Sequence, residues 1–326
     1  MGVMRLALAV AVLVSHAGLR ARGLNPGVSA VIGFYLISGY VMTGLMRRHY
    51  AGAGRVAAFY ADRLLRILPQ YLLYAGATLA WFVVTGTRTD FLARSPGALD
   101  LLNNLTVVPL NFFMFNGADR FTLIPPAWSL GAELQFYLLV PLLVLWPRLG
   151  AVLVAGSLGV HGAALAGRLH ADWFGYRLLA GVLWVFAAGM LLFVLQRARP
   201  RWADALALAA PVLAVIVYLV LRARGLHAVP YNQEVLIGWG LGVPLLHWLS
   251  RRPSGRLDTL AGDLSYGVFL NHFLLIWCLQ PLLGTVGGAD LLALIVASLL
   301  LSGFTQRLVE RPVLAWRRRL RLSSAP

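Results

Sequence analysis

Residues 178–195, LLAGVLWVFAAGMLLFVL, form an apolar run without a charged side chain. A helix that crosses the hydrocarbon core needs about 20 predominantly apolar residues, so this run predicts a transmembrane helix over 178–196. Similar runs recur along the chain and predict further spans at about 3–19, 27–46, 67–85, 128–147, 150–166, 203–221, 233–249, 263–283 and 289–306. The sequence therefore predicts an all-α, polytopic membrane helical bundle of about ten transmembrane helices, forming one domain over residues 1–326.

The composition excludes a soluble protein. Hydrophobic residues make up 60% of the chain and charged residues only 12%, whereas roughly a quarter of the residues in a soluble domain are charged. The net charge of +16 comes from 28 basic residues, all arginine, which lie between apolar runs. This placement fits membrane topology and predicts no nucleic-acid partner. The single Cys278 and the absence of zinc-ligand spacing predict no intramolecular disulfide and no metal site.

The arginines predict the direction of the chain. With the N-terminus in the cytoplasm, nineteen arginines fall inside and nine outside, the outer set being Arg20, Arg22, Arg88, Arg94, Arg120, Arg168, Arg177, Arg222 and Arg224. Arginines favour short cytoplasmic loops, so the count predicts that both termini are cytoplasmic. The longest connection, 86–127, falls outside and carries recurrent apolar residues. It is predicted either to cover the bundle as an interfacial helix or to re-enter the membrane as a lid over an acceptor site.

Ionisable side chains within apolar spans require a partner or a function, because burying one costs roughly 2.5–3.5 kcal/mol or more. Arg5 and His16 are three helical turns apart on one face of the first span, roughly 16 Å along its axis. His16 can act as a general base. The alternatives are that Arg5 extends to the membrane surface and that His16 is a hydrogen-bonded packing residue.

Arg63 and Arg66 share a face at the cytoplasmic entrance of the third span, at i,i+3 spacing. Paired guanidinium groups suit phosphate oxygens. The alternative is a topological role for both arginines, with an ion pair to Asp62.

Three further spans carry polar candidates. In the fourth span, Trp128 suits the membrane interface, while Ser129 and Glu133 share a face at i,i+4 spacing. Glu133 is predicted either to need a partner or to interact with the positive end of the helix dipole. His272, near the middle of the ninth span, is predicted to form a structural hydrogen bond within the bundle. The alternative for His272, as for Trp128 and Ser129, is contact with the substrate. Glu310, at the end of the last span, is predicted to pair with neighbouring arginines.

The order of these motifs resembles the acyltransferase-3 family of bacterial membrane acyltransferases. It comprises Arg5 and His16, FYLISGY at 34–40, YADRLLRILP at 60–69, WSLGAELQFY at 128–137, SYGVFLNH at 265–272, and ERP at 310–312. The likeness extends from about residue 5 to 312. It implies that the first helix is retained rather than cleaved as a signal peptide. It departs at Ile32, where the family often has an acidic residue.

The resemblance implies transfer of an acyl group, often acetyl, from cytoplasmic acyl-coenzyme A to a hydroxyl of a surface or secreted carbohydrate or glycoconjugate. Some members have an additional soluble domain, which we do not expect in these 326 residues. The resemblance implies that His16 is catalytic and that the paired arginines handle acetyl-CoA, with Arg5 adding to their positive site. It also implies the bacterial inner membrane as the location.

The predicted mechanism places coenzyme A phosphates at Arg63 and Arg66, with His16 taking the acceptor proton directly or forming an acyl-His intermediate. Glu133 orients the imidazole or binds the sugar. Competing interpretations are a transporter or flippase for a lipid-linked glycan, or a membrane scaffold. The oligomeric state stays open, because apolar surfaces that face lipid or a partner look alike in sequence.

Overall fold

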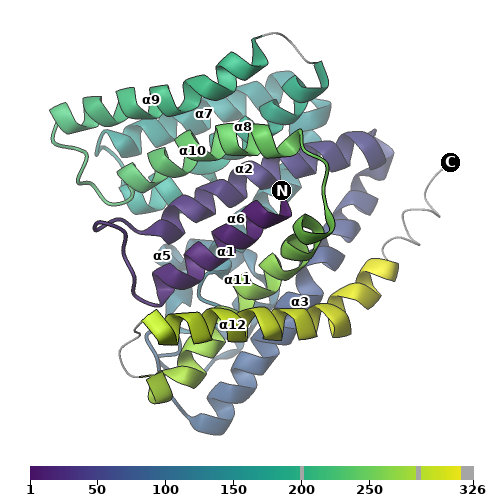
Figure 1. Cartoon of the computed structure of the whole chain (residues 1–326), viewed down its shortest axis with the longest axis vertical. Coiled ribbons are helices and arrows are strands. Elements are labelled where there is room, and N and C mark those ends of the chain that lie inside the picture. Colours follow the sequence, from purple (N-terminus) through teal and green to yellow (C-terminus); the bar gives the residue numbers. More distant parts are fainter. Residues whose placement is uncertain (199–201, 284–287, 317–326) are drawn as a thin grey trace. The chain divides into compact units, whose positions relative to one another are not determined.

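A computed structural model describes residues 1–198, 202–283 and 288–316 (Figure 1). Its long helices lie at all ten predicted positions: α1 (Gly2–His16), α2 (Pro26–His49), α3 (Val56–Thr85), α6 (Ala127–Leu145), α7 (Pro147–Leu165), α8 (Leu179–Ala198), α9 (Ala203–Ala223), α10 (Asn232–Ser250), α11 (Arg256–Leu283) and α12 (Gly288–Thr305). Short elements are η1 (Ala53–Arg55), α4 (Ala98–Thr106), η2 (Val108–Phe112), α5 (Phe113–Asn116), η3 (Ala118–Arg120), η4 (Trp173–Arg177) and η5 (Gln306–Glu310). Within these ranges, β-pairing is limited to isolated bridges.

Eight of the helices are long and apolar enough to cross a membrane, and the bent segment 98–116 raises the number to nine if it counts as one span. The all-α membrane bundle is thereby confirmed. α1 is shorter, at 15 residues, and α10 is less apolar because it contains Gln233, Glu234 and His247. The cytoplasmic location of the termini stays a prediction. Six arginines in the inner count, Arg199, Arg201, Arg317, Arg318, Arg319 and Arg321, lie outside the described residues.

Two helices begin before the predicted apolar spans do. The third span was predicted from residue 67, but α3 begins at Val56, and the ninth was predicted from 263, but α11 begins at Arg256. Charged residues interrupt the apolar run at the start of each of these two helices. The arginines among them do not interrupt the helix itself, because arginine has a high helix propensity. Arg63 and Arg66 therefore lie inside α3, ahead of its predicted apolar span. Their place at the cytoplasmic entrance of the membrane stays a prediction.

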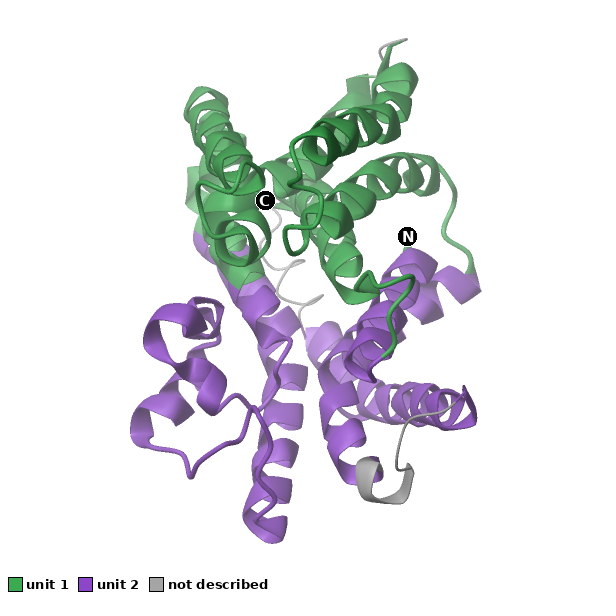
Figure 2. Ribbon diagram, turned by 90° about the vertical axis from the view of Figure 1, so that its left-hand side faces the viewer, with its two compact units in different colours: residues 1, 19–56, 132–255 green, residues 2–18, 57–131, 256–326 purple. Residues whose placement is uncertain are grey.

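The chain divides into two compact units, shown in Figure 2. The first contains residues 1, 19–56 and 132–255, and the second contains residues 2–18, 57–131 and 256–326. Each unit combines segments that are far apart in the sequence.

In the first unit, α2 packs closely against α8 and α10 through glycines. A Cβ atom added at Gly189 would lie 2.0 Å from the Leu36 carbonyl oxygen, and one added at Gly238 would lie 2.7 Å from the Ser29 carbonyl oxygen. Small residues let membrane helices approach closely enough for extensive van der Waals contact. α2 and α10 run parallel, since the contacts progress from Ser29–Gly238 to Leu36–Gly242.

In the second unit, α1 and α11 run parallel in matching register. The Val3 amide donates to Asp258 Oδ1 at 3.0 Å near one end, and His16 meets His272 at the other. α3 runs in the same direction, because Tyr266 contacts Ile67 and, farther along, Asn271 contacts Tyr74. These directions agree with the predicted alternation, in which the first, third and ninth spans all point the same way.

The connection 86–127 contains a sharply bent helix pair. α4 and the η2–α5 segment meet at 106°, the geometry of a broken span or a re-entrant loop. Asn104 holds the segment in place: its Nδ2 donates to the Phe121 carbonyl at 3.0 Å, and its Oδ1 accepts from the Leu123 amide at 2.8 Å. The bend favours re-entry over a straight interfacial helix.

Candidate active site

His16 is the last residue of α1, and its side chain is exposed. Its Nδ1 atom lies 3.0 Å from Nε2 of His272, and the two rings are almost parallel, at an interplanar angle of 8°. His272 has no exposed surface. The exposed imidazole of His16 is thus held at one nitrogen by the buried imidazole of His272. A general base is oriented by a second group in the same way. The hydrogen bond predicted for His272 is present, but sequence reasoning did not identify His16 as its partner.

A series of aromatic rings in contact extends from His16 within the second unit. The ring of Phe273 lies 4.7 Å from the His16 ring, and Phe91 and Trp277 each contact Phe273, at 5.4 and 5.3 Å between centroids. Trp81 stacks on Trp277 at 5.8 Å. Sequence analysis missed this wall of Trp81, Phe91, Phe273 and Trp277. The only local signal was the position of Phe273 and Trp277 after His272 on the same helix.

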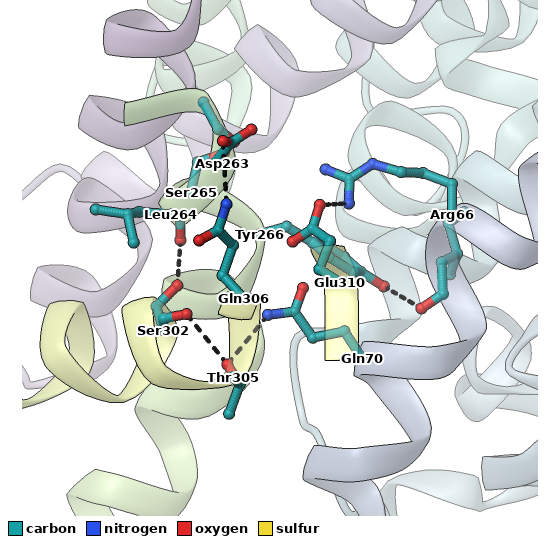
Figure 3. A network of polar contacts seen from close by, with 12 residues as sticks. Arg66, Gln70, Asp263, Leu264, Ser265, Tyr266, Ser302, Thr305, Gln306 and Glu310 are labelled. Carbon is teal, nitrogen blue, oxygen red and sulfur yellow. Dashed lines mark hydrogen bonds and ion pairs between the residues drawn. The ribbon is translucent and has the colours of Figure 1, made fainter. Parts of the chain in front are cut away.

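Arg66 lies in a polar network that joins α3, α11 and the end of α12 (Figure 3). It forms an ion pair with Glu310 and lies 5.4 Å above the Tyr266 ring. Tyr74 and Thr305 share a hydrogen bond of 2.7 Å in the same network. The pairing expected for Glu310 is therefore present, with Arg66 as the partner.

The predicted pair of arginines is divided between two carboxylates. Arg63 is buried and binds its neighbour Asp62, as one of the sequence interpretations proposed. The hollow beside Arg66 and Glu310 measures about 10 Å³, which is enough for about one water molecule. As Arg66 and Glu310 are arranged here, this hollow is too small for a phosphate group. Arg5 is half-buried on α1, three turns before His16.

Hydrogen bonds also hold the remaining candidates, Glu133, Ser129 and Trp128. Glu133, in the first unit, accepts hydrogen bonds from Ser38 Oγ at 2.6 Å and from Tyr137 Oη at 2.5 Å. The Ser129 hydroxyl donates to the Pro126 carbonyl at 2.9 Å at the start of α6. The Trp128 carbonyl accepts from Asn111 Nδ2 at 3.1 Å. These bonds stabilise the start of α6 and tie the FYLISGY motif to Glu133.

Comparison with known protein families identifies the chain's family. A family model described as an acyltransferase domain matches residues 2–307. The chain belongs to the acyltransferase-3 family. It is a multi-pass membrane O-acyltransferase. Its eight long apolar helices have the length and composition needed to cross a membrane.

Similar proteins include an uncharacterized protein of Aquifex aeolicus (strain VF5). It is 34% identical over 57% of this chain and 84% of the length of that protein. BcsY of Komagataeibacter xylinus, which bears the name of a membrane-bound transacylase, is 28% identical over 86% of this chain and 67% of its own. The O-acetyltransferase OatA of Staphylococcus aureus (strain NCTC 8325 / PS 47) is 28% identical over 41% of this chain and 23% of its own. No solved structure matches the chain.

Proposed function

We propose that this acyltransferase moves an acyl group, specifically acetyl, from cytoplasmic acyl-coenzyme A to a hydroxyl of a cell-envelope or secreted carbohydrate, with His16 as general base. One observation carries the proposal: the exposed imidazole of His16 is held by a hydrogen bond to the buried ring of His272. A general base needs a ring that the substrate can reach and that a second group orients. We place the protein in the bacterial inner membrane, where the donor is accessible from the cytoplasm.

The reaction needs one base and one positioned donor. The acceptor oxygen attacks the thioester carbonyl carbon, and His16 takes the hydroxyl proton. Collapse of the tetrahedral intermediate breaks the carbon–sulfur bond, and the proton passes from His16 to the departing thiolate. The products are the acylated carbohydrate and free coenzyme A.

The spacing of residues in the second unit supports a donor path. Arg66 lies above Tyr266, and His16 meets His272, six residues farther along α11. These two levels are about 9 Å apart along the helix, a separation that suits the long, thin pantetheine arm. The proposed donor-binding residues are Arg66, Arg63 and Arg5, and a donor phosphate would replace Glu310 as the partner of Arg66.

Two features support a carbohydrate acceptor. In the aromatic wall beside His16, Trp81 and Phe91 are partly exposed, and aromatic surface suits the C–H faces of a sugar ring. Phe273 and Trp277 are buried and back this surface. The Glu133 carboxylate already accepts bonds from two hydroxyl groups, as it would from a sugar. We therefore keep Glu133 as a proposed catalytic or acceptor-binding residue.

Mass spectrometry of the host's envelope glycans and secreted glycosylated products tests the proposal. The strains are a deletion, the deletion carrying wild-type protein, and the deletion carrying His16→Ala at matched membrane abundance. We expect an acyl mass to disappear on deletion and to return only with the wild type, since losing a general base costs roughly 10²–10⁴-fold in rate. Equal restoration by both proteins would exclude His16 as the base and favour transport or scaffolding.

A further inference from the structure

The hydrogen bonds of His272 determine which of its ring nitrogens carries the proton. Its Nδ1 atom lies 3.1 Å from the carbonyl oxygen of Val268, one turn earlier on α11. A carbonyl oxygen can only accept, so Nδ1 must donate and therefore carries the hydrogen. In the neutral ring, Nε2 then carries the lone pair and can only accept.

The accepting nitrogen of His272 faces His16. Nε2 of His272 lies 3.0 Å from Nδ1 of His16, so Nδ1 of His16 is the donor. In a neutral His16 ring the proton is then on Nδ1 and the lone pair is on Nε2. Two hydrogen bonds in series, beginning at the Val268 carbonyl, select one of the two tautomers of His16.

The other protonation state of His272 is costly. A doubly protonated ring would reverse the bond to His16, but His272 has no exposed surface and packs against Phe269 and Phe273. In the part of the chain that the structure describes, no acidic side chain contacts it. A cation buried without a carboxylate partner is strongly disfavoured, so His272 stays neutral.

Helix packing holds the two rings at this distance. Gly2 packs on α11, where an added Cβ atom would lie 1.7 Å from the Asp258 carbonyl oxygen, and the Val3 amide binds the Asp258 side chain. Position 16 is fourteen residues after position 2, and position 272 is fourteen residues after 258. The parallel register therefore brings His16 opposite His272.

We propose that His272 is a positioning residue that holds His16 in the Nδ1–H tautomer, so that Nε2 of His16 takes the acceptor proton. The chemical consequence rests on the proposed function. When Nε2 is protonated, the His16 cation keeps its Nδ1–H bond to His272 and lies at the C-terminal end of α1, where the helix dipole favours a positive charge. The proton then leaves Nε2 for the coenzyme A thiolate, and His272 stays neutral throughout.

Substitution of His272 separates positioning from packing. His272→Gln keeps an acceptor, because its carbonyl oxygen reaches about as far as Nε2, whereas His272→Leu removes it. His161→Leu is the matched control, since His161 is also a buried histidine on a membrane helix, in the first unit. Purified full-length proteins in phosphatidylethanolamine–phosphatidylglycerol vesicles receive labelled acetyl-CoA and an envelope-glycan extract from the deletion strain.

For His272→Leu we expect kcat to fall about 100-fold or more, with the KM for acetyl-CoA within about twofold of wild type, because a base in the wrong tautomer loses the proton-transfer step. His272→Gln is expected to keep kcat within about tenfold, and the control is expected to remain active. Wild-type kcat in His272→Leu, or equal losses in the Gln and Leu variants, would overturn the positioning role.

Nitrogen-15 solid-state NMR reads the tautomer without any turnover. The chain has seven histidines, and the His16 signals are assigned by their loss in His16→Gln. At about pH 8.5, where imidazoles are neutral, we expect a protonated Nδ1 on wild-type His16 and a shift toward the Nε2–H form in His272→Leu. A wild-type Nε2–H form overturns the proposal. If wild-type protein shows the Nδ1–H spectrum of His16 but has no transfer activity, the proposed function is contradicted and the role of His272 in selecting the tautomer still stands.

Discussion

Arg63 and Arg66 differ in how far a ligand can reach them. The Arg63 side chain is 8% exposed and bound to Asp62, whereas the Arg66 side chain is 24% exposed and bound to Glu310. Pairing keeps each charge tolerable inside an apolar helix bundle. Of the two, Arg66 is therefore the better candidate for direct contact with a donor phosphate.

The expected consequence is a donor-binding defect in Arg66→Ala. We expect the KM for acetyl-CoA to rise about tenfold, because one charge-assisted hydrogen bond of about 1.5–3 kcal/mol is lost, with a smaller change in kcat. Steady-state kinetics on reconstituted protein provides the measurement. Arg307→Ala, at an exposed arginine near the end of α12, controls for the loss of charge. Equal KM values in both variants would remove Arg66 from the donor site.

Among the helices, closeness of approach depends on individual glycines. α2 and α8 approach so closely that a single added methyl group at Gly189 would overlap the Leu36 backbone. Backbone cannot rotate out of the way as a side chain can, so the helices must separate. By contrast, Gly159 on α7 has open space around its Cα atom.

Gly189→Ala should therefore destabilise the first unit by roughly 1–3 kcal/mol, the usual cost of overpacking. The expected result is a lower Tm in detergent, followed by intrinsic tryptophan fluorescence. Gly159→Ala provides the control and should leave the Tm almost unchanged. Identical melting of both variants would show that α2 and α8 are not in this close contact.

At the level of the whole molecule, we predict that α10 crosses the membrane. It is not among the eight helices that satisfy the length and composition criteria, yet it packs parallel to α2 along much of its length. The arginine count also favours it as a span, since without it α11 and α12 would reverse direction.

Accessible thiols placed on either side of α10 test this topology. In a Cys278→Ser background, which removes the only cysteine, Arg224→Cys and Pro253→Cys introduce single thiols at exposed positions before and after α10. We expect a membrane-impermeant maleimide to label position 224 in spheroplasts and position 253 only after permeabilisation. Labelling of both from the same side would show that α10 does not cross.

Much of the fold follows from local sequence properties. Apolar runs located all ten long helices, because each run indicates its own insertion into the membrane without reference to distant residues. Eight of these helices meet the criteria of length and apolarity for a span. Charged residues were less informative about boundaries: α3 and α11 begin well before their apolar runs. The motif order also predicted the family, which the match over residues 2–307 confirms.

The sequence by itself determined a membrane helix bundle, the acyltransferase-3 family and the candidate residues His16 and Arg66. Only the tertiary structure decided what those residues contact. His272 is 256 positions from His16, and Glu310 is 244 positions from Arg66. Helical periodicity shows which face of one helix is apolar but not which helix packs against it or in what register. Those partners depend on glycine-mediated approach and parallel alignment, and these arise only when the chain is folded.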